Sequence, residues 1–498
     1  MSSLAFSWDE WSRLDAVGLG QLVAGGQVNA AETAAQAIAA ARLVEPQLDA
    51  VLETFDDLAD GLAPESSTAG DPLRGVPFFI KDLGSAIGGR LSENGSALWH
   101  GRRAERTDPL LQNLQRAGLV AVGRSTTAEL GMTYDTTTTY RGLKSTRNPW
   151  NRERSPGGSS GGSAALVAAG AVPLAHSTDG AGSTRIPAAL CGLVGLKVSR
   201  GRLPLPWSFN EYGNATIGEG CFSRSVRDTA AFLDAAAAHH PIGNAFVAAP
   251  APAHYAAALA QPVRPLRIAL STGAWGRDTP CSGHIAGRVR EVARALQALG
   301  HEVEEISDEQ ISDWQAFWPS FRTFWLGIRP GGWGLPYGGE IPEYLLPQLS
   351  PMARRLWENS RRYDKLDVLR HQAANKAHAL RLGALFGRWD VLLTPTFAID
   401  APQANGDFSL AHEHDLDAFV ERLLDAGRYV IPASDAGIPA ISLPAGLSDA
   451  GMPVGVQFWG HWFEEALLLQ LAAQLDSAHP EWFAPRPPIH VARLGRSG

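Results

Sequence analysis

Residues 155–197, SPGGSSGGSAALVAAGAVPLAHSTDGAGSTRIPAALCGLVGLK, are the stretch around which the fold of this chain is expected to be built. The stretch contains two clusters rich in glycine and serine, residues 157–163 and residues 179–184. Glycine allows a positive φ and the close approach of another group, and serine supplies a hydroxyl that can act as a nucleophile or a relay. Both clusters are therefore predicted to shape the backbone around a site and to take part in its chemistry.

The alanine-rich sequence between the clusters, residues 164–175, predicts a buried helix followed by a short strand, with Pro173 near the break. After the second cluster, Pro187 and residues 188–190 predict another helix. Ser183 is then expected at or just before the N-terminus of that helix, where backbone N–H groups have no partner within the helix. This position is suited to the stabilisation of an oxyanion.

Two other interpretations of the clusters were weighed. An isolated GGSSGGS is typical of a flexible linker, but here it continues directly into apolar sequence that is typical of a core. Glycine-rich turns before helices also bind phosphate, yet neither cluster ends in Lys-Ser or Lys-Thr. Neither is a G-x-G-x-x-G with an acidic residue about 20 positions further on. The sequence therefore favours a buried catalytic site.

The composition is that of a soluble globular protein. The chain has 498 residues, of which 45% are hydrophobic and 19% charged. That length suits one very large domain or two or three ordinary ones. A net charge of −8 without long basic runs argues against a nucleic-acid or membrane partner.

The cysteines and the N-terminal sequence predict the cellular compartment of the protein. Cys191, Cys221 and Cys281 are odd in number and widely spaced, which indicates a reducing environment without a disulfide framework. Charged residues stand near the N-terminus where a signal peptide needs its apolar region, and no stretch approaches the roughly 20 apolar residues of a membrane span. These features predict a cytoplasmic protein.

A lysine follows a predicted buried strand in the first part of the chain. In LRGVPFFIKDLGS, residues 76–80 are apolar, and Lys81 and Asp82 stand at the end of the run. Burial penalises an ammonium group and lowers its pKa, which makes a lysine usable as a base near neutral pH. A single lysine at a strand end more often reaches out to solvent, so its assignment depends on the residues around it.

Two further regions are candidates for binding a substrate. The sequence from Glu129 to Asp135 leads into the threonine run 136–139 and predicts a loop on a pocket floor, with Gly131, Met132, Thr133 and Tyr134 as candidate substrate contacts. Segment 310–345 is rich in tryptophan, phenylalanine and tyrosine. Aromatic residues at helical spacing predict core packing, whereas the irregular GGWG at 331–334, with Trp333, predicts the wall of a hydrophobic substrate channel.

One cluster suggests a metal site at first sight. His412, Glu413, His414 and Asp415 are consecutive. They lie in a predicted polar loop with no matching pattern of distant ligands, so a solvated cluster is the favoured interpretation. We expect no metal and no organic cofactor.

Taken together, GVPFFIKD, SPGGSSGG and TDGAGSTRIP resemble the amidase signature family. The later segments DVLLTPT, GIPAISLPAG and GMPVGVQF extend the resemblance over nearly the whole chain. It implies a single α/β amidase-signature domain, in which a large twisted mixed β-sheet is flanked by α-helices on both faces. The strand and helix alternation of the sequence is compatible with that architecture.

The resemblance also implies a catalytic set of a nucleophilic serine, a second serine preceded by a cis peptide bond, and a lysine. By motif these are Ser183, Ser159 and Lys81. Ser160 is the rival for the bridging position and ranks second, because the family's bridging residue is the first serine after the glycine pair.

The backbone N–H groups of Gly180, Ala181, Gly182 and Ser183 are the oxyanion hole that the resemblance implies. Gly180 and Ala181 stand where the family more commonly has a bulkier residue followed by glycine. Because donation uses the main chain, the hole is expected to tolerate this difference.

The implied reaction is acyl transfer to water through an acyl-enzyme on Ser183. Lys81 would act as the base and Ser159 as the relay. The sequence around DGAGSTRIPAALCG is closest in appearance to the branch of nylon-oligomer hydrolases, aryl acylamidases and urethane-cleaving enzymes. We therefore expect amides, and also carbamates and esters, of apolar or aryl substrates.

Two alternatives remain open at this stage. One is the glutaminase subunit of a tRNA-dependent amidotransferase, which shares the fold and the catalytic set. The other is a noncatalytic binding protein on the same scaffold. The presence of Lys81, Ser159 and Ser183 together argues against the second.

The expected organisation is a helical arm over residues 1–60 followed by the amidase signature domain over residues 61–498. Within that domain, residues 73–230 are the expected catalytic core and residues 310–345 the expected channel segment. The expected partners are a small-molecule amide or carbamate, with the chain acting as a monomer or a homodimer.

Overall fold

The computed structural model describes residues 4–59, 71–139, 142–209, 216–240, 246–251 and 253–496. An eleven-stranded mixed sheet runs through the described part of the chain, with the strand order β1-β3-β2-β6-β8-β7-β12-β13-β11-β9-β10, and β4 and β5 form a separate pair. The strands are β1 Val51–Thr54, β2 Pro77–Lys81, β3 Val120–Ser125, β4 Thr137–Thr138, β5 Lys144–Ser145, β6 Leu174–Asp179, β7 Val194–Lys197, β8 Gly218–Ser223, β9 Arg267–Leu270, β10 Glu302–Glu305, β11 Val391–Pro395, β12 Ala440–Leu447 and β13 Pro453–Gly460.

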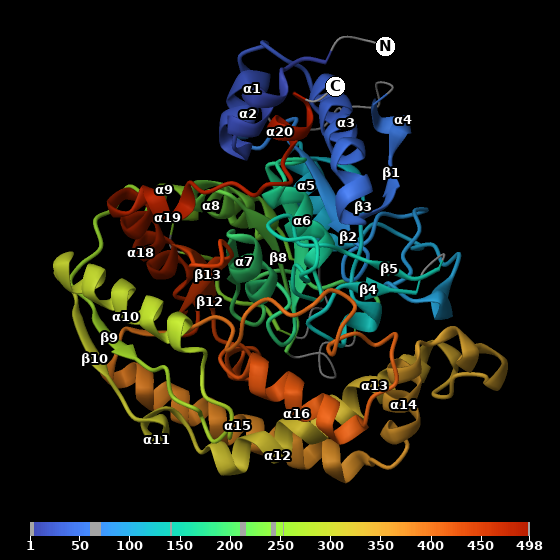
Figure 1. Ribbon diagram of the computed structural model, residues 1–498, viewed down its shortest axis with the longest axis vertical. Coiled ribbons are helices and arrows are strands. Elements are labelled where there is room, and N and C mark those ends of the chain that lie inside the picture. Colours follow the sequence, from blue (N-terminus) through green and yellow to red (C-terminus); the bar gives the residue numbers. More distant parts are fainter. Residues whose placement is uncertain are drawn as a thin grey trace.

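Helices flank this sheet (Figure 1). The α-helices are α1 Trp8–Arg13, α2 Ala16–Ala24, α3 Ala30–Leu48, α4 Asp56–Ala59, α5 Pro109–Arg116, α6 Gly161–Ala168, α7 Arg185–Cys191, α8 Val226–Ala236, α9 Tyr255–Ala258, α10 Gly283–Ala298, α11 Asp308–Ile311, α12 Trp314–Thr323, α13 Arg329–Gly331, α14 Pro351–Ser360, α15 Lys365–Arg388, α16 Leu416–Gly427, α17 Ile431–Ala436, α18 Glu465–Ala478, α19 Pro480–Phe483 and α20 Val491–Leu494. The η elements are the 3₁₀ helices η1 Ala97–Trp99, η2 Glu129–Gly131, η4 Gly332–Tyr337 and η5 Glu343–Gln348, and the π-helix η3 Phe324–Ile328.

The sheet separates two hydrophobic cores. On β11, Val391 and Leu393 belong to one core, whereas Leu392 between them belongs to the other. The same alternation divides Phe458 from Trp459 on β13, as expected because successive side chains of a strand point to opposite faces. Both faces are therefore covered, and the predicted fold class is confirmed.

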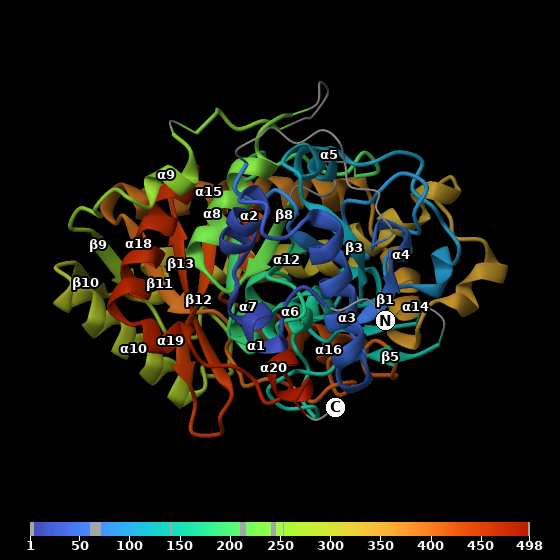
Figure 2. The same cartoon turned by 90° about the horizontal axis from the view of Figure 1, so that it is seen from above.

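Different helices build the two cores. The first core contains residues of α3, α5, α6, α8, α10 and α18, and the second contains residues of α12, α14, α15, α16 and α17. Figure 1 shows α12, α15 and α16 side by side, away from the chain ends. Figure 2 looks down on the opposite end, where α1, α2 and α3 lie in front and α18 and α19 lie beside them.

In the N-terminal part, the sequence predicts a helix that is capped by Asn29 and runs through Ala41, with a break at Pro46. Asn29 caps α3 as predicted, accepting hydrogen bonds from the N–H groups of Ala31 and Glu32. Pro46, however, does not break the helix, which continues to Leu48 and ends at Asp49 in the left-handed conformation. The alanine-rich face of α3 is buried in the first core, and this packing outweighs the lost N–H of one proline near the helix end.

The expected division between an arm and a catalytic domain falls at residues 60 and 61, which lie outside the described residues. On the N-terminal side of that point, β1 already forms an edge of the large sheet by pairing antiparallel with β3. The two-part organisation remains a prediction. No described helix has the length and apolar character needed to cross a bilayer.

The strand order brings the segment that ends in Lys81 next to the second glycine-serine cluster. β2 and β6 are adjacent and parallel, so their carboxyl ends meet at the same edge of the sheet. Lys81 ends β2 and Asp179 ends β6. The end of the lysine strand is thereby placed beside the second glycine-serine cluster, at the kind of sheet edge where α/β proteins bind ligands.

Candidate active site

The site centres on Lys81, which is 1% exposed at the end of β2. Its Nζ donates hydrogen bonds to Ser159 Oγ, at 2.8 Å, and to Thr178 Oγ1, at 2.7 Å. The peptide bond between Gly158 and Ser159 is cis. The carbonyl of Ser159 accepts from the Ala128 N–H at 3.0 Å, so both ends of the residue are fixed by neighbouring elements.

Burial brings the pKa of the Lys81 ammonium group close to neutrality. Desolvation, together with the positive charge of Arg329, lowers the pKa of Lys81 to about 7 against the opposing effects of Glu219 and Asp179. A substantial fraction of Lys81 is therefore neutral near pH 7. A neutral lysine within hydrogen-bond distance of a serine hydroxyl has the geometry of a general base.

The second cluster is organised by a buried ion pair. The Asp179 carboxylate accepts from Arg185 Nε at 2.9 Å and Arg185 Nη2 at 2.9 Å, and it also accepts from the Gly182 N–H at 2.7 Å. Although burial raises the pKa of Asp179, the guanidinium and these donors together hold it well below its usual range. The carboxylate thus ties the turn before α7 to the first residue of that helix.

Ser183 lies in this turn, immediately before Thr184, the N-cap of α7. Its side chain is largely buried, with 6% of the residue exposed. Ser160 joins the first cluster to β6, because its Oγ donates to the Thr178 carbonyl at 3.2 Å. The structure therefore brings the strand that precedes Ser183 against both Lys81 and the first cluster.

Gly182 requires the absence of a side chain. Its φ is 109°, and a Cβ at this position would lie 2.4 Å from Val430 Cγ2. A residue with a side chain would be strained in this conformation and would also collide with Val430. This glycine fixes the sharp turn that presents Ser183.

The turn corrects one part of the expected oxyanion hole. The Gly182 N–H is already bound to the Asp179 carboxylate, so it is not available to an oxyanion. The N–H groups of Gly180, Ala181 and Ser183 have no hydrogen-bond acceptor among the described residues. Three of the four expected donors therefore remain as candidates.

The buried pair of His176 and Glu219 holds the backbone of Lys81 in place. The backbone N–H of Lys81 donates to His176 Nδ1 at 3.3 Å, and His176 Nε2 is hydrogen-bonded to Glu219. All three residues are buried. His176 and Glu219 thus fix the end of β2 and place a carboxylate near the Lys81 ammonium.

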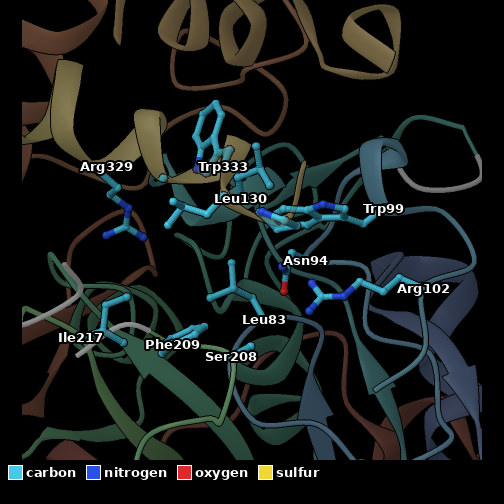
Figure 3. Close-up of a pocket in the computed structure, with 13 residues that line it drawn as sticks. Leu83, Asn94, Trp99, Arg102, Leu130, Ser208, Phe209, Ile217, Arg329 and Trp333 are labelled. Atoms are coloured by element: carbon cyan, nitrogen blue, oxygen red, sulfur yellow. The ribbon is translucent and has the colours of Figure 1, made fainter. Parts of the chain in front are cut away.

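A pocket opens beside this site (Figure 3). Apolar side chains form most of its wall, among them Leu83, Trp99, Leu130, Phe209 and Ile217, while Asn94, Arg102, Ser208 and Arg329 add polar groups. Lys81, Ser159 and Ser183 do not line the pocket, but Gly131 places one residue of its wall close to Ser159. A Cβ built on Gly131 would lie 3.1 Å from Leu83 Cδ1 and 3.4 Å from Ser159 Oγ. We infer that a ligand in the pocket can approach the serines.

Of the five predicted substrate contacts, Trp333 lines the pocket. Gly131 does not line it, but lies next to Ser159 and to two residues of its wall, Leu83 and Arg329. Figure 3 shows the indole of Trp333 directed away from the other labelled side chains. Met132 is buried in the second core, and Thr133 Oγ1 donates to the Phe408 carbonyl. Tyr134 donates to the Ala181 carbonyl at 3.1 Å. These last three do not line the pocket; Tyr134 instead supports the turn before Ser183.

The aromatic segment mainly builds a core, as its helical spacing predicts. Trp314, Phe317, Trp318, Phe321 and Trp325 are all buried in the second core. The pocket is lined by Arg329 and by the glycine-bearing part of the segment, Gly332, Trp333, Leu335 and Pro336. This glycine-bearing part is a 3₁₀ helix rather than irregular chain.

The cluster at residues 412–415 has local partners. His412 Nε2 lies 2.9 Å from the Asn405 carbonyl, and His414 stacks on Phe419. Within the described ranges, no three histidine, cysteine, aspartate or glutamate side chains are placed to hold a metal ion.

Four residues near Lys81 and the pocket were not predicted from the sequence: Thr178, His176, Glu219 and Arg329. A signal for the first two was present, because AHSTDG places polar residues within a predicted buried strand. Buried polar side chains need partners, and here the partners belong to the lysine strand. Glu219 and Arg329 are remote in sequence and had no comparable signal.

Known proteins resemble this chain over nearly its whole length. The family model described as Amidase matches residues 32–469. The chain is 36% identical to 6-aminohexanoate-cyclic-dimer hydrolase of Paenarthrobacter ureafaciens, and the match covers 97% of each chain. It is 34% identical to the putative amidase AmiC of Mycobacterium tuberculosis (strain ATCC 25618 / H37Rv), over 96% of this chain and 97% of that protein.

Solved structures show the same architecture. The structure of 6-aminohexanoate cyclic dimer hydrolase complexed with substrate superimposes with a TM-score of 0.86 at 32% sequence identity, covering 97% of this chain and 99% of that chain. A bacterial aryl acylamidase gives a TM-score of 0.77 at 25% identity, covering 95% and 99%.

Proposed function

The chain belongs to the amidase signature family and is an amide hydrolase, and we propose that it cleaves small-molecule amides through an acyl-enzyme on Ser183. The observation that carries this proposal is the 2.8 Å hydrogen bond between Lys81 Nζ and Ser159 Oγ. It pairs a buried lysine with a serine at the edge of the sheet where the Ser183 turn begins.

In the proposed reaction, neutral Lys81 accepts a proton from Ser159 while Ser159 accepts one from Ser183. Ser183 Oγ then forms a bond to the carbonyl carbon of the amide. The N–H groups of Gly180, Ala181 and Ser183 stabilise the negative charge on the carbonyl oxygen.

As the intermediate collapses, the C–N bond breaks and the proton held by Lys81 returns through Ser159 to the departing amine. Water then attacks the acyl-enzyme by the same relay and releases the acid and free Ser183. Each proton taken up by the lysine is returned once per half-reaction, so no co-reactant other than water is required.

We further propose that the acyl or amine group of the substrate is apolar or aryl. Leu83, Leu130 and Ile217 offer an apolar surface, and Trp99 and Phe209 offer aromatic faces. Carbamates and esters present the same carbonyl to Ser183 and belong to this proposal. The relatives named as 6-aminohexanoate-cyclic-dimer hydrolase support an amide with an alkyl chain.

Hydrolysis of a small panel tests the proposal. We expect the purified chain to cleave an aryl anilide or a linear alkyl amide, with an aryl carbamate as a further substrate, and to cleave glutamine poorly. Release of the amine is the measurement. Turnover of glutamine alone would instead support an amidotransferase subunit, and binding of the amides without turnover would support a noncatalytic protein.

Separate alanine substitutions of Ser159 and Ser160 distinguish the roles of these two neighbouring serines. We expect Ser159→Ala to lower kcat by about 10²–10⁴-fold, because it interrupts the proton relay. Ser160→Ala should lower kcat less than tenfold, since the Ser160 hydroxyl binds the Thr178 backbone rather than Lys81. Steady-state kinetics on one anilide would measure both. A larger loss for Ser160→Ala would reverse the assignment of the bridging serine.

A further inference from the structure

We propose that Arg329 binds a carboxylate of the substrate, so that the preferred amides carry an acidic group on the acyl or the amine side. This inference rests on the proposed function and narrows its substrate class. It is carried by the position of the guanidinium, its surroundings and its missing counter-ion.

Arg329 begins α13 and lies between the two catalytic clusters. A Cβ built on Gly131 would lie 3.3 Å from Arg329 Nη2, and one built on Gly180 would lie 2.9 Å from Arg329 Nη1. The same face of Gly131 meets Ser159 Oγ, and Gly180 opens the candidate oxyanion turn. The guanidinium therefore lies at the inner end of the pocket, next to the groups that would react.

The half-buried side chain of Arg329 faces the pocket rather than bulk solvent. It lines the pocket together with Ile217 and Leu130, and Figure 3 shows its guanidinium directed into the space near these two residues. Burial lowers the pKa of Arg329 to about 10. The group still carries its charge at neutral pH, in surroundings that disfavour charge.

No acidic side chain in the described ranges lies within 4.0 Å of this guanidinium. Its recorded contacts are a long hydrogen bond from Nη2 to the Gly131 carbonyl, at 3.4 Å, and the ring of Trp325, 5.1 Å from Cζ. A guanidinium has five N–H donors in a planar fork that matches a carboxylate. Most of this capacity is unused.

The other large buried arginine of the site shows the contrast. Arg185 is fully buried and is neutralised by Asp179, with further bonds to Gln457 and Ser434. A partly desolvated cation without a carboxylate is costly, whereas a bound anionic group would supply the missing counter-charge. Because the nearby wall is apolar, a carboxylate of the ligand would find its partner at Arg329.

The proposal is tested first by binding, in the Ser183→Ala background, so that it does not depend on turnover. Two matched pairs of ligands are used. Glutaranilic acid is compared with 5-methylhexananilide, which has an isopropyl group in place of an acyl-side carboxylate. N-butyryl-4-aminobutanoate is compared with N-(4-methylpentyl)butanamide, which makes the same replacement on the amine side.

In calorimetry, we expect the acid of at least one pair to bind roughly 10- to 100-fold more tightly than its neutral partner, as for a hydrogen bond to a charged group. Arg329→Met should abolish this preference by weakening only the acid. Arg329→Lys, which keeps the charge but not the fork, should restore part of it. The pair that shows the preference identifies the side that carries the carboxylate.

Three results would overturn the proposal: no preference for the acid in either pair, a preference that survives in Arg329→Met, or a preference lost instead in Arg102→Met, the other arginine of the pocket. Circular dichroism would verify that the variants fold. If the only effect of Arg329 were to lower the pKa of Lys81, Arg329→Met would change kcat equally for acid and neutral substrates. If the acid binds selectively but the unmodified chain hydrolyses none of the four amides, the proposed function fails while the assignment of Arg329 stands.

Discussion

Ser183→Ala is expected to lower kcat for amide hydrolysis by about 10⁴-fold or more, since removal of a nucleophile abolishes the covalent route. The substitution removes one oxygen from a largely buried position. It leaves the Asp179 and Arg185 pair that holds the turn in place. Substrate binding should therefore persist while turnover is lost, and kcat rather than KM should carry the effect.

Ser163→Ala is a matched control for this variant. Ser163 is likewise buried, and lies in the first cluster, but its hydroxyl is hydrogen-bonded to the Ser125 hydroxyl at 2.7 Å rather than to Lys81. We expect a change in kcat of less than tenfold. Mass spectrometry of the intact chain with a slow aryl carbamate should show one added acyl group, absent in Ser183→Ala. An acyl group retained by that variant would place the nucleophile elsewhere.

Much of the fold followed from local patterns. The sequence predicts a helix over residues 416–427 and a strand pair over residues 438–444 and 454–458. The helix agrees with α16, and the strand pair forms β12 and β13. Pro46 was misinterpreted because the sequence alone does not show that α3 is held by the first core. Tertiary packing decided that helix end, against the local preference of proline.

The candidate site was predictable in part, for a physical reason. Local patterns of glycine, serine and apolar residues identify the segments that contain Lys81, Ser159 and the Ser183 turn. The use of the Gly182 N–H by Asp179 depends on the conformation of the turn, which the sequence does not reveal. Arg329 and Glu219 reach the site only because the sheet and the second core bring distant segments together.

The pH dependence of kcat/KM should report Lys81. Since desolvation lowers the pKa of Lys81 to about 7 and the neutral amine is the base, activity should rise with pH and level off above about pH 8. Below about pH 6 it should fall roughly tenfold per pH unit. Lys81→Met should lose about 10²–10⁴-fold in kcat/KM on the plateau above pH 8 and should no longer show this titration. A profile that is flat from pH 5 to 9 would contradict the assignment.

Lys197 provides the control that makes this assignment specific. Burial also lowers the pKa of Lys197 to about 7, but its Nζ donates to the carbonyls of Val198 and Ile438, each at 2.8 Å. Lys197→Met, if it folds, should therefore keep the same apparent pKa in kcat/KM. Glu219→Gln should shift that apparent pKa downward, because Glu219 raises the pKa of Lys81. An apparent pKa that changes in Lys197→Met but not in Glu219→Gln would show that Lys81 is not the titrating base.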